Sequence, residues 1–246
     1  MYTFSKLFLR YCASFFAFIL SLLVVMGAIK DTILLEATTA SVASSLPVIV
    51  LDAGHGGEDC GAIGVNGVYE KDINFSITRG VAELLRGAGY YVLETRTDDA
   101  LLYDPVTVEK GKKKNTDLYN RLQISERNTN ALFVSIHMNS FPASPKQNGS
   151  QIWYSPNHPF SYEMAKLLRK YIVDDFALCN SRALMKSEGN LYLLDRASHP
   201  SVILECGFLS NPDECAKLSN EMYQNQLSFA IFCAMIEVIK LYGDQA

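Results

Sequence analysis

Hydrophobic and polar residues form short, regular blocks along the chain after residue 46. Five short apolar runs, rich in β-branched or aromatic residues, predict strands at residues 48–51, 90–95, 132–136, 150–154 and 201–204. Apolar residues spaced three or four apart predict helices over residues 73–85, 118–130, 159–176, 211–218 and 221–242. Alternating strands and helices predict an α/β fold, with a mostly parallel, twisted central sheet flanked by helices on both faces of a single domain.

One long segment of this domain, residues 96–116, has no hydrophobic period. It carries a group of aspartates followed by a group of lysines. Loops of this length in compact domains are often functional lids or are disordered. Two interpretations stay open, a solvated charged loop and a substrate clamp.

The start of the chain has a different pattern. Residues 11–29 contain no charge, and this run is long enough to cross a hydrocarbon core of about 30 Å. Lys6 and Arg10 precede the run, which predicts a cytoplasmic N-terminus and an exported remainder. Three interpretations are open: an uncleaved anchor, a signal peptide cleaved for instance after Ala43, and a buried core helix.

These patterns divide the chain into three parts. We expect a membrane anchor or signal segment at residues 1–30, a short polar linker at residues 31–46 and a single folded domain at residues 47–243. Because of this N-terminal segment, we expect the domain to be exported. We expect it at the outer face of the membrane, either anchored there or released after cleavage.

Composition and charge exclude several classes of protein. Hydrophobic residues make up 49% and charged residues 20% of the chain, which excludes a disordered protein. The net charge is −4, and because residues 1–46 contribute +1, the remainder carries −5. A domain of that sign is a poor partner for nucleic-acid phosphates, so we expect no nucleic-acid binding.

The six cysteines contain no C-x-x-C pair, which argues against a thiolate zinc site. Cys12 lies in the apolar run and leaves an odd number in the exported part. We expect those cysteines to be small buried hydrophobic residues, with a single disulfide as the open alternative.

Polar side chains capable of catalysis follow three of the predicted strands. His55, His137 and Glu205 each come shortly after a buried strand, and Glu70 stands just before a helix. Ligands of open α/β sheets bind beyond the carboxyl ends of the strands, so parallel strands would bring these side chains to one edge. A carboxylate at the start of a helix is favoured by the helix dipole.

Two imidazoles and one carboxylate, with one open position, are the ligand set of a catalytic zinc site. The remaining carboxylate can then act as a general base toward a water molecule. Each residue also has an ordinary interpretation, as a hydrogen-bonded residue at a strand end or a first-turn charge. His158 and His199 each precede a proline, and we expect them to be turn residues rather than ligands.

Four motifs in series resemble the zinc-dependent N-acetylmuramoyl-L-alanine amidases of the type 3 family. They are Asp52-Ala-Gly-His-Gly-Gly, Glu70-Lys-Asp, Ser135-Ile-His-Met-Asn and Glu205-Cys-Gly-Phe-Leu-Ser-Asn. The resemblance covers about residues 47–242. Within the family, the single domain behind one apolar segment is most similar to the germination-specific amidases of spore-forming bacteria.

The resemblance implies one Zn²⁺ ion per chain, held by His55, Glu70 and His137, with Glu205 as the catalytic residue. It implies hydrolysis of the amide between N-acetylmuramic acid and the L-alanine of the peptidoglycan stem peptide. The germination-specific resemblance further implies maturation of spore cortex, through formation of muramic-δ-lactam, and a lipoprotein partner in the spore envelope.

Several further residues have predicted roles, and two alternative functions stay open. Asp52 or Asn139 would orient a ligand imidazole or bind the peptide, and Arg121 would meet a stem-peptide carboxylate or form a helix-surface salt bridge. Cys206 is a poor candidate nucleophile, because both suitable histidines are better explained as ligands. The alternative functions are another zinc hydrolase of the wall, such as a carboxypeptidase or a deacetylase, and a non-catalytic wall-binding module.

Overall fold

The computed structural model describes residues 26, 46–103, 112–176 and 182–244. Apart from Met26 and Leu46, the expected anchor or signal segment and the linker lie outside the described residues. The chain divides into two units, Met1–Leu46 and Pro47–Ala246, and the described residues belong almost entirely to the second.

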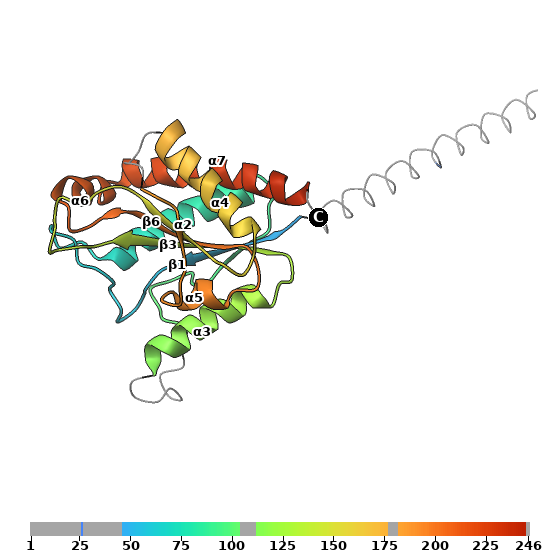
Figure 1. Cartoon of the computed structure of the whole chain (residues 1–246), viewed down its shortest axis with the longest axis horizontal. Coiled ribbons are helices and arrows are strands. Elements are labelled where there is room, and N and C mark those ends of the chain that lie inside the picture. Colours follow the sequence, from blue (N-terminus) through green and yellow to red (C-terminus); the bar gives the residue numbers. More distant parts are fainter. Residues whose placement is uncertain (1–25, 27–45, 104–111, 177–181, 245–246) are drawn as a thin grey trace, which may run out of the picture. The chain divides into compact units, whose positions relative to one another are not determined.

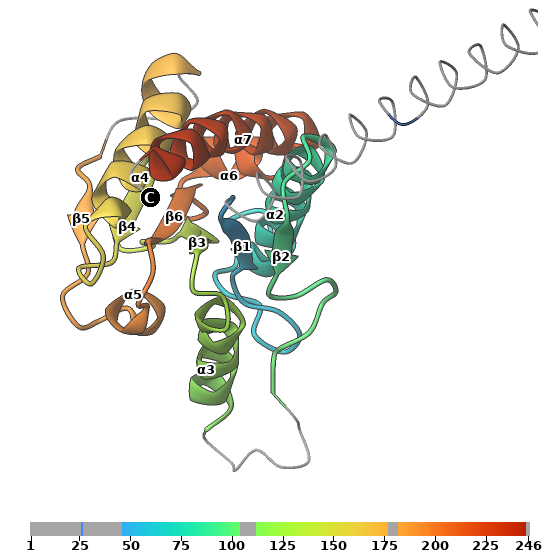
Figure 2. The ribbon, with the colours of Figure 1, turned by 90° about the vertical axis from the view of Figure 1, so that its right-hand side faces the viewer.

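Six strands form one sheet in the order β2-β1-β3-β6-β4-β5; Figure 1 labels its central strands β1, β3 and β6, and Figure 2 labels all of them. The strands are β1 (Val48–Ala53), β2 (Val92–Glu94), β3 (Ala131–Asn139), β4 (Gln151–Tyr154), β5 (Met185–Lys186) and β6 (Ser201–Phe208). Every neighbouring pair is parallel except β4 and β6, which are antiparallel. The predicted mostly parallel sheet is therefore confirmed.

Helices cover both faces of this sheet, as predicted. Figure 2 shows α2, α4 and α7 on one face and α3 and α5 on the other. The helices are α2 (Glu70–Gly87), α3 (Lys113–Glu126), α4 (Phe160–Arg169), the π-helical turn η1 (Lys170–Asp175), α5 (Tyr192–Arg196), α6 (Pro212–Leu218) and α7 (Glu221–Gly243). The α/β fold with a single domain after the N-terminal unit agrees with the prediction.

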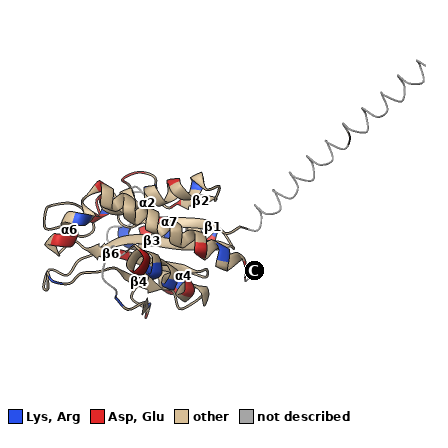
Figure 3. Cartoon of the chain, turned by 90° about the horizontal axis from the view of Figure 1, so that it is seen from above, with Lys and Arg blue, Asp and Glu red and all other residues tan. Residues whose placement is uncertain are grey.

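The larger core lies between the sheet and α2, α4 and α7. Alternate strand residues such as Leu51 and Val134 enter this core, where they join Ile77 of α2 and Ile231 of α7. Among the described residues, α7 is the one helix whose length and hydropathy suffice to span a membrane. It carries few charges (Figure 3), and it packs in the core against α2 and α4.

The smaller core lies on the opposite face, under α3 and α5. Val50 and Phe133 of the sheet pack there with Leu122 of α3 and Leu193 of α5. Both helices are short, and they leave part of this face to polar side chains. The candidate site lies in that part.

The structure corrects several predicted boundaries. His137 and Glu205 lie inside β3 and β6, not after them, because the pairing of these strands continues through the two residues. Helix α3 begins at Lys113, five residues before its predicted start, and so takes in the end of the predicted 96–116 loop. Residues 104–111 of that loop lie outside the described residues. The predicted helix 159–176 is divided into α4 and η1.

The four described cysteines outside the N-terminal unit form no disulfide with one another. Cys206 and Cys215 are buried in the larger core, as predicted. Cys206 lies on the face opposite to its neighbour Glu205, because successive strand residues point to opposite faces. This position removes the cysteine-nucleophile alternative.

Candidate metal centre and active site

The first candidate ligand, His55, lies in a turn that follows β1. Its φ angle is 62°, a left-handed conformation that non-glycine residues rarely adopt. Such a conformation persists only where the surrounding contacts hold it. Here Arg121 donates a hydrogen bond of 2.7 Å from Nη2 to the carbonyl oxygen of His55.

Two buried arginines hold the three backbone carbonyls of this turn. Arg121 Nη1 and Arg96 Nε both donate to the carbonyl oxygen of Ala53, at 2.7 and 2.9 Å. Arg96 Nη2 also donates to the carbonyl oxygen of Gly54, at 3.3 Å. The position of the His55 backbone is therefore fixed by charged donors from α3 and from the segment after β2.

Arg121 is itself neutralised by two buried carboxylates. Its Nη1 lies 2.7 Å from Asp52 Oδ1, and its Nε lies 2.8 Å from Asp117 Oδ2. Burial raises the pKa of Asp52, but Arg121 and the hydroxyls of Ser135 and Thr95 outweigh it and lower that pKa. Arg121 is 1% exposed, so the predicted surface salt bridge is in fact buried, while its predicted role toward a stem-peptide carboxylate stays a prediction.

The second candidate ligand, Glu70, opens helix α2 and is buried. Its Oε1 accepts hydrogen bonds from the backbone N–H of Met138 at 3.0 Å and from Asn74 Nδ2 at 3.3 Å. Its Oε2 accepts from the backbone N–H of Ala62 at 2.8 Å. The positive end of the helix dipole also favours a carboxylate at this position. Glu70 is thus held as an anion at one place.

The two imidazoles meet at this carboxylate. His137 Nδ1 lies 3.0 Å and His55 Nε2 lies 3.3 Å from Glu70 Oε1. One potential ligand atom from each of the three residues lies within 4.8 Å of the other two. Among the described residues, this is the one group of three or more histidines, cysteines and acidic residues that could hold a metal ion. The predicted convergence of the three side chains is thereby observed.

The donor set and its surroundings fit a small cation. Two nitrogens and one carboxylate oxygen are typical of a zinc site with three protein ligands. Glycines allow the close approach, because a Cβ at Gly54 would overlap the His137 ring and a Cβ at Gly61 would overlap Glu70 and His55.

The charge of Glu70 stabilises the protonated form of the His55 imidazole. Burial disfavours the charged imidazole of His55, but the hydrogen bonds and charges of Glu70 and Asp59 raise its pKa to about 9. Burial raises the pKa of Glu70, and the neighbouring His137 and His55 nevertheless hold it far below its usual range. Since a histidine must be neutral to ligate a metal, a cation at this position would replace the proton of His55.

Glu205 is placed beside the group by strand pairing. It is the partner of His137 in the parallel pair β3–β6, so both side chains point to the same face of the sheet. Its Oε2 is buried and has no hydrogen-bond partner among the described residues. Burial raises the pKa of Glu205 to about 7, with Glu70 adding to the shift and His137 opposing it. A buried, unpaired carboxylate is costly and is typical of a functional site.

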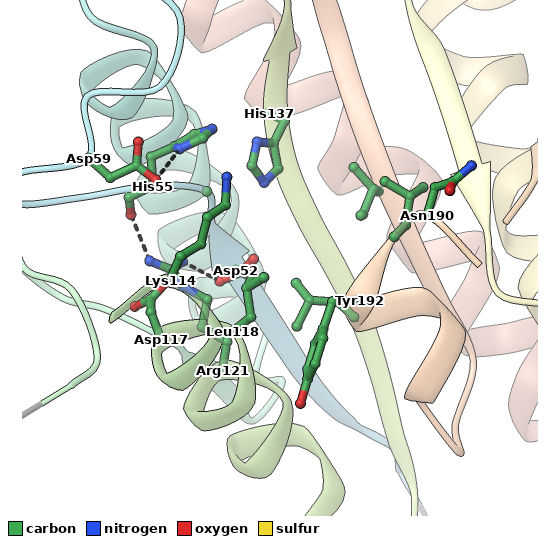
Figure 4. A pocket seen from close by; sticks show the side chains of 14 residues that line it. Asp52, His55, Asp59, Lys114, Asp117, Leu118, Arg121, His137, Asn190 and Tyr192 are labelled. Atoms are coloured by element: carbon green, nitrogen blue, oxygen red, sulfur yellow. Dashed lines mark hydrogen bonds and ion pairs between the residues drawn. The ribbon is translucent and has the colours of Figure 1, made fainter. Parts of the chain in front are cut away.

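A cavity of about 250 Å³ opens beside the imidazoles (Figure 4). The sheet forms its floor, α3 forms one wall, and Asn190, Leu191 and Tyr192 at the start of α5 form the other. His55 and His137 line this cavity. A ligand bound there would contact both rings.

One residue of the site was missed in the sequence. Asp59 Oδ2 lies 2.9 Å from His55 Nδ1, which leaves the Nε2 atom facing Glu70. Carboxylates that orient a ligand imidazole are usual around metals, and the four-residue spacing in a glycine-rich turn was the available signal. The structure shows no hydrogen bond from the described Asp52 or Asn139 to either imidazole, so their predicted orienting role is not observed.

The other two histidines lie away from the group, as predicted. His158 Nδ1 accepts the backbone N–H of Phe160 at 3.2 Å. His199 is buried rather than exposed in a turn, and its Nε2 lies 3.3 Å from Glu126 Oε1. Neither ring approaches the candidate ligands.

Comparison with known proteins agrees with this geometry. The protein family described as "N-acetylmuramoyl-L-alanine amidase" matches residues 49–237. The germination-specific N-acetylmuramoyl-L-alanine amidase of Bacillus subtilis (strain 168) is 32% identical over 199 residues, which cover 80% of this chain and 81% of the relative.

Two solved structures are similar as well. The CwlD amidase from Clostridioides difficile, in complex with the GerS lipoprotein, has 36% identity and a TM-score of 0.73, covering 79% of this chain and 99% of that one. The catalytic domain of the amidase CwlV from Bacillus (Paenibacillus) polymyxa has 30% identity and a TM-score of 0.68, with the same coverage. These matches confirm the predicted enzyme class over a carboxypeptidase, a deacetylase or a binding module. The chain belongs to the N-acetylmuramoyl-L-alanine amidase family.

Proposed function

We propose that this chain is a zinc-dependent amidase of peptidoglycan. It hydrolyses the amide between the lactyl group of N-acetylmuramic acid and the L-alanine of the stem peptide. The observation that supports this proposal is the meeting of two imidazoles and a carboxylate within 4.8 Å, together with Glu205, whose Oε2 is buried without a hydrogen-bond partner among the described residues.

His55, Glu70 and His137 are the residues that would hold the zinc ion. When bound, zinc supplies Lewis-acid polarisation of the amide carbonyl and a water molecule of lowered pKa. The hydrogen bond from His55 to Asp59 and the buried arginines keep the His55 ring in place for this task. The cavity between α3 and α5 holds the substrate against the rings.

Glu205 moves the proton in this mechanism. Its Oε2 accepts a proton from the attacking water and returns it to the departing L-alanine nitrogen. A carboxyl whose pKa is raised to about 7 can do both near neutral pH. The reaction needs no covalent bond between enzyme and substrate.

The test uses the full-length protein, purified in detergent, and peptidoglycan digests analysed by mass spectrometry. We expect new L-alanine amino termini, loss of activity in chelator and recovery with added zinc. Glu205→Gln should retain zinc and lose about 10²–10⁴-fold in turnover, because a positioned general base contributes that much.

The matched control is Glu163→Gln, a glutamate of α4 on the opposite face of the sheet. It should leave turnover unchanged. Near-normal activity of Glu205→Gln would remove Glu205 from its role. Release of acetate, or cleavage that persists unchanged in chelator, would overturn the zinc amidase proposal.

We further propose that the substrate is spore cortex. The support is the similarity to the germination-specific amidase of Bacillus subtilis. Expressed in a Bacillus subtilis strain that lacks that amidase, the chain should restore muramic-δ-lactam to the cortex. Peptidoglycan cleavage by the purified protein without any restored lactam would exclude this narrower role.

A lipoprotein partner and an exported position complete the proposal. The CwlD amidase, which is 36% identical, was solved with the GerS lipoprotein, and the apolar residues 11–29 would export or anchor the domain. Accessibility of the domain to external protease in intact forespores, and co-purification with a lipoprotein, test these two points.

A further inference from the structure

The cavity beside the imidazoles contains several charged side chains, and all but one are paired with one another. Arg121 pairs with Asp52 and Asp117, and Asp59 pairs with His55. The remaining charged residue of the cavity lining is Lys114, in the first turn of α3.

Lys114 is exposed, and the described residues give it no hydrogen-bond or ion-pair partner. Figure 4 shows its side chain extending from α3 toward the space between His55 and His137. The first turn of α3 carries no acidic residue that would neutralise it. Its charge reaches the site, because it contributes to the lowered pKa of Asp59.

The neighbouring lysine is a contrast on the same turn. Lys113 Nζ lies 2.6 Å from Glu58 Oε1 and 5.4 Å from the centroid of the Tyr103 ring. It does not line the cavity. One lysine of this turn therefore has its partner inside the protein, and the other presents its ammonium group to whatever enters the cavity.

We propose that Lys114 binds a free carboxylate of the stem peptide and so selects the substrate, an inference that rests on the proposed amidase function. The residue after L-alanine in a stem peptide is a D-glutamate joined through its side chain, which leaves its α-carboxylate free or amidated. A lysine ammonium forms an ion pair with the carboxylate, whereas the neutral amide offers it only a carbonyl oxygen as a weaker hydrogen-bond acceptor.

The net charge of the domain gives such a residue a purpose. The exported part carries −5, so an acidic peptide is repelled except where a local positive group faces it. Lys114 comes from α3, whereas Glu205 lies within β6, and we assign Lys114 to binding the peptide rather than to proton transfer.

The test compares two synthetic substrates, N-acetylmuramoyl-L-alanyl-D-glutamate and its α-amide, N-acetylmuramoyl-L-alanyl-D-isoglutamine. The full-length protein should prefer the free acid. Lys114→Met should raise KM for the acid about three- to tenfold, as for loss of a solvated charge pair, with kcat and zinc content unchanged. It should leave KM for the amide unchanged. Lys113→Met should behave like the unaltered protein, and Lys114→Arg should keep the preference.

Affinity measurements test the role of Lys114 independently of the proposed amidase activity. The affinities of both compounds are measured by calorimetry in the Glu205→Gln background, with and without Lys114→Met. Cleavage of neither compound by the unaltered protein would overturn the amidase proposal alone. Equal loss of affinity for acid and amide, no loss for either, or a fall in kcat with both substrates would overturn the role of Lys114.

Discussion

The two faces of the central sheet differ in what covers them. The face under α2, α4 and α7 is closed by apolar side chains such as Leu51, Val134 and Ile231. The face under α3 and α5 contains buried charges, a cavity of about 250 Å³ and the imidazoles of His55 and His137, which Glu70 joins from the start of α2. The same strands serve both faces, because successive residues point to opposite sides.

The two faces therefore contribute differently to the protein. The apolar face stabilises the fold, and the polar face positions the side chains of the site. Apolar burial is proportional to area and has no direction, so it stabilises the domain without fixing any atom exactly. Hydrogen bonds and buried ion pairs depend on distance and angle, and they fix groups at the cost of desolvation. We therefore expect mutations on the two faces to have different consequences.

The largest expected effect is on the polar face. Asp52→Asn breaks the buried pair with Arg121, and we expect it to lower the free energy of unfolding at pH 7 by about 3–5 kcal/mol. The folded protein lowers the pKa of Asp52, so this contribution is complete above the unfolded value of about 3.9 and is lost as the pH falls through the folded value. Urea unfolding in chelator at pH 7, 5 and 3 measures it.

The control for this prediction is Asp98→Asn, an exposed aspartate close to the same network. It should change stability by less than about 0.5 kcal/mol at each pH. A difference between the unaltered protein and Asp52→Asn that stays constant from pH 7 to pH 3 would contradict the ionised pair.

The apolar face should respond in stability only. Ile231→Ala removes a fully buried side chain from α7 and should cost about 2–5 kcal/mol, independent of pH. Zinc affinity of the folded variant should not change. Unfolding curves and zinc titrations measure both, with the exposed Phe229→Ala of the same helix as control. A weakened zinc affinity in Ile231→Ala would show that the faces are not separate.

The smallest expected effect is on zinc affinity, through the position of the His55 ring. Asp59→Ala removes the carboxylate that orients His55, and we expect zinc affinity to fall about 10–100-fold. Asp59→Asn retains an acceptor and should lose less. Competition with a coloured chelator measures the affinities, and unfolding in chelator should show little change. Equal affinities of the alanine variant and the unaltered protein would remove Asp59 from the site.

The sequence predicted the sheet and the convergence of the candidate ligands well, for physical reasons. Buried strands such as β1 and β6 are continuous β-branched runs, and parallel strands align their carboxyl ends. The predicted ends of β3 and β6 were too early. His137 and Glu205 are polar, so they end the apolar run of each strand, but the hydrogen-bonded pairing of the strands continues through them. The roles of the metal ligands and of Glu205 stay predictions.

The hydrophobic periodicity of the sequence could not predict the partners of Arg121. Its contact with Asp52 joins residues 69 positions apart, and no local pattern reports such a pair. The short elements β5 and α5 were missed because two to five residues show no period. The sequence therefore did not predict that Asn190, Leu191 and Tyr192 make one wall of the cavity.

The pairing of β3 with β6 has a consequence for how such enzymes can diverge. Neighbouring strands lie about 4.8 Å apart wherever a ladder forms, so the backbones that hold His137 and Glu205 keep a standard separation. Insertions or replacements in α3 and α5 leave that separation untouched. The cavity walls formed by α3 and α5 can therefore change to suit other glycans or peptides, while His137 and Glu205 keep their separation.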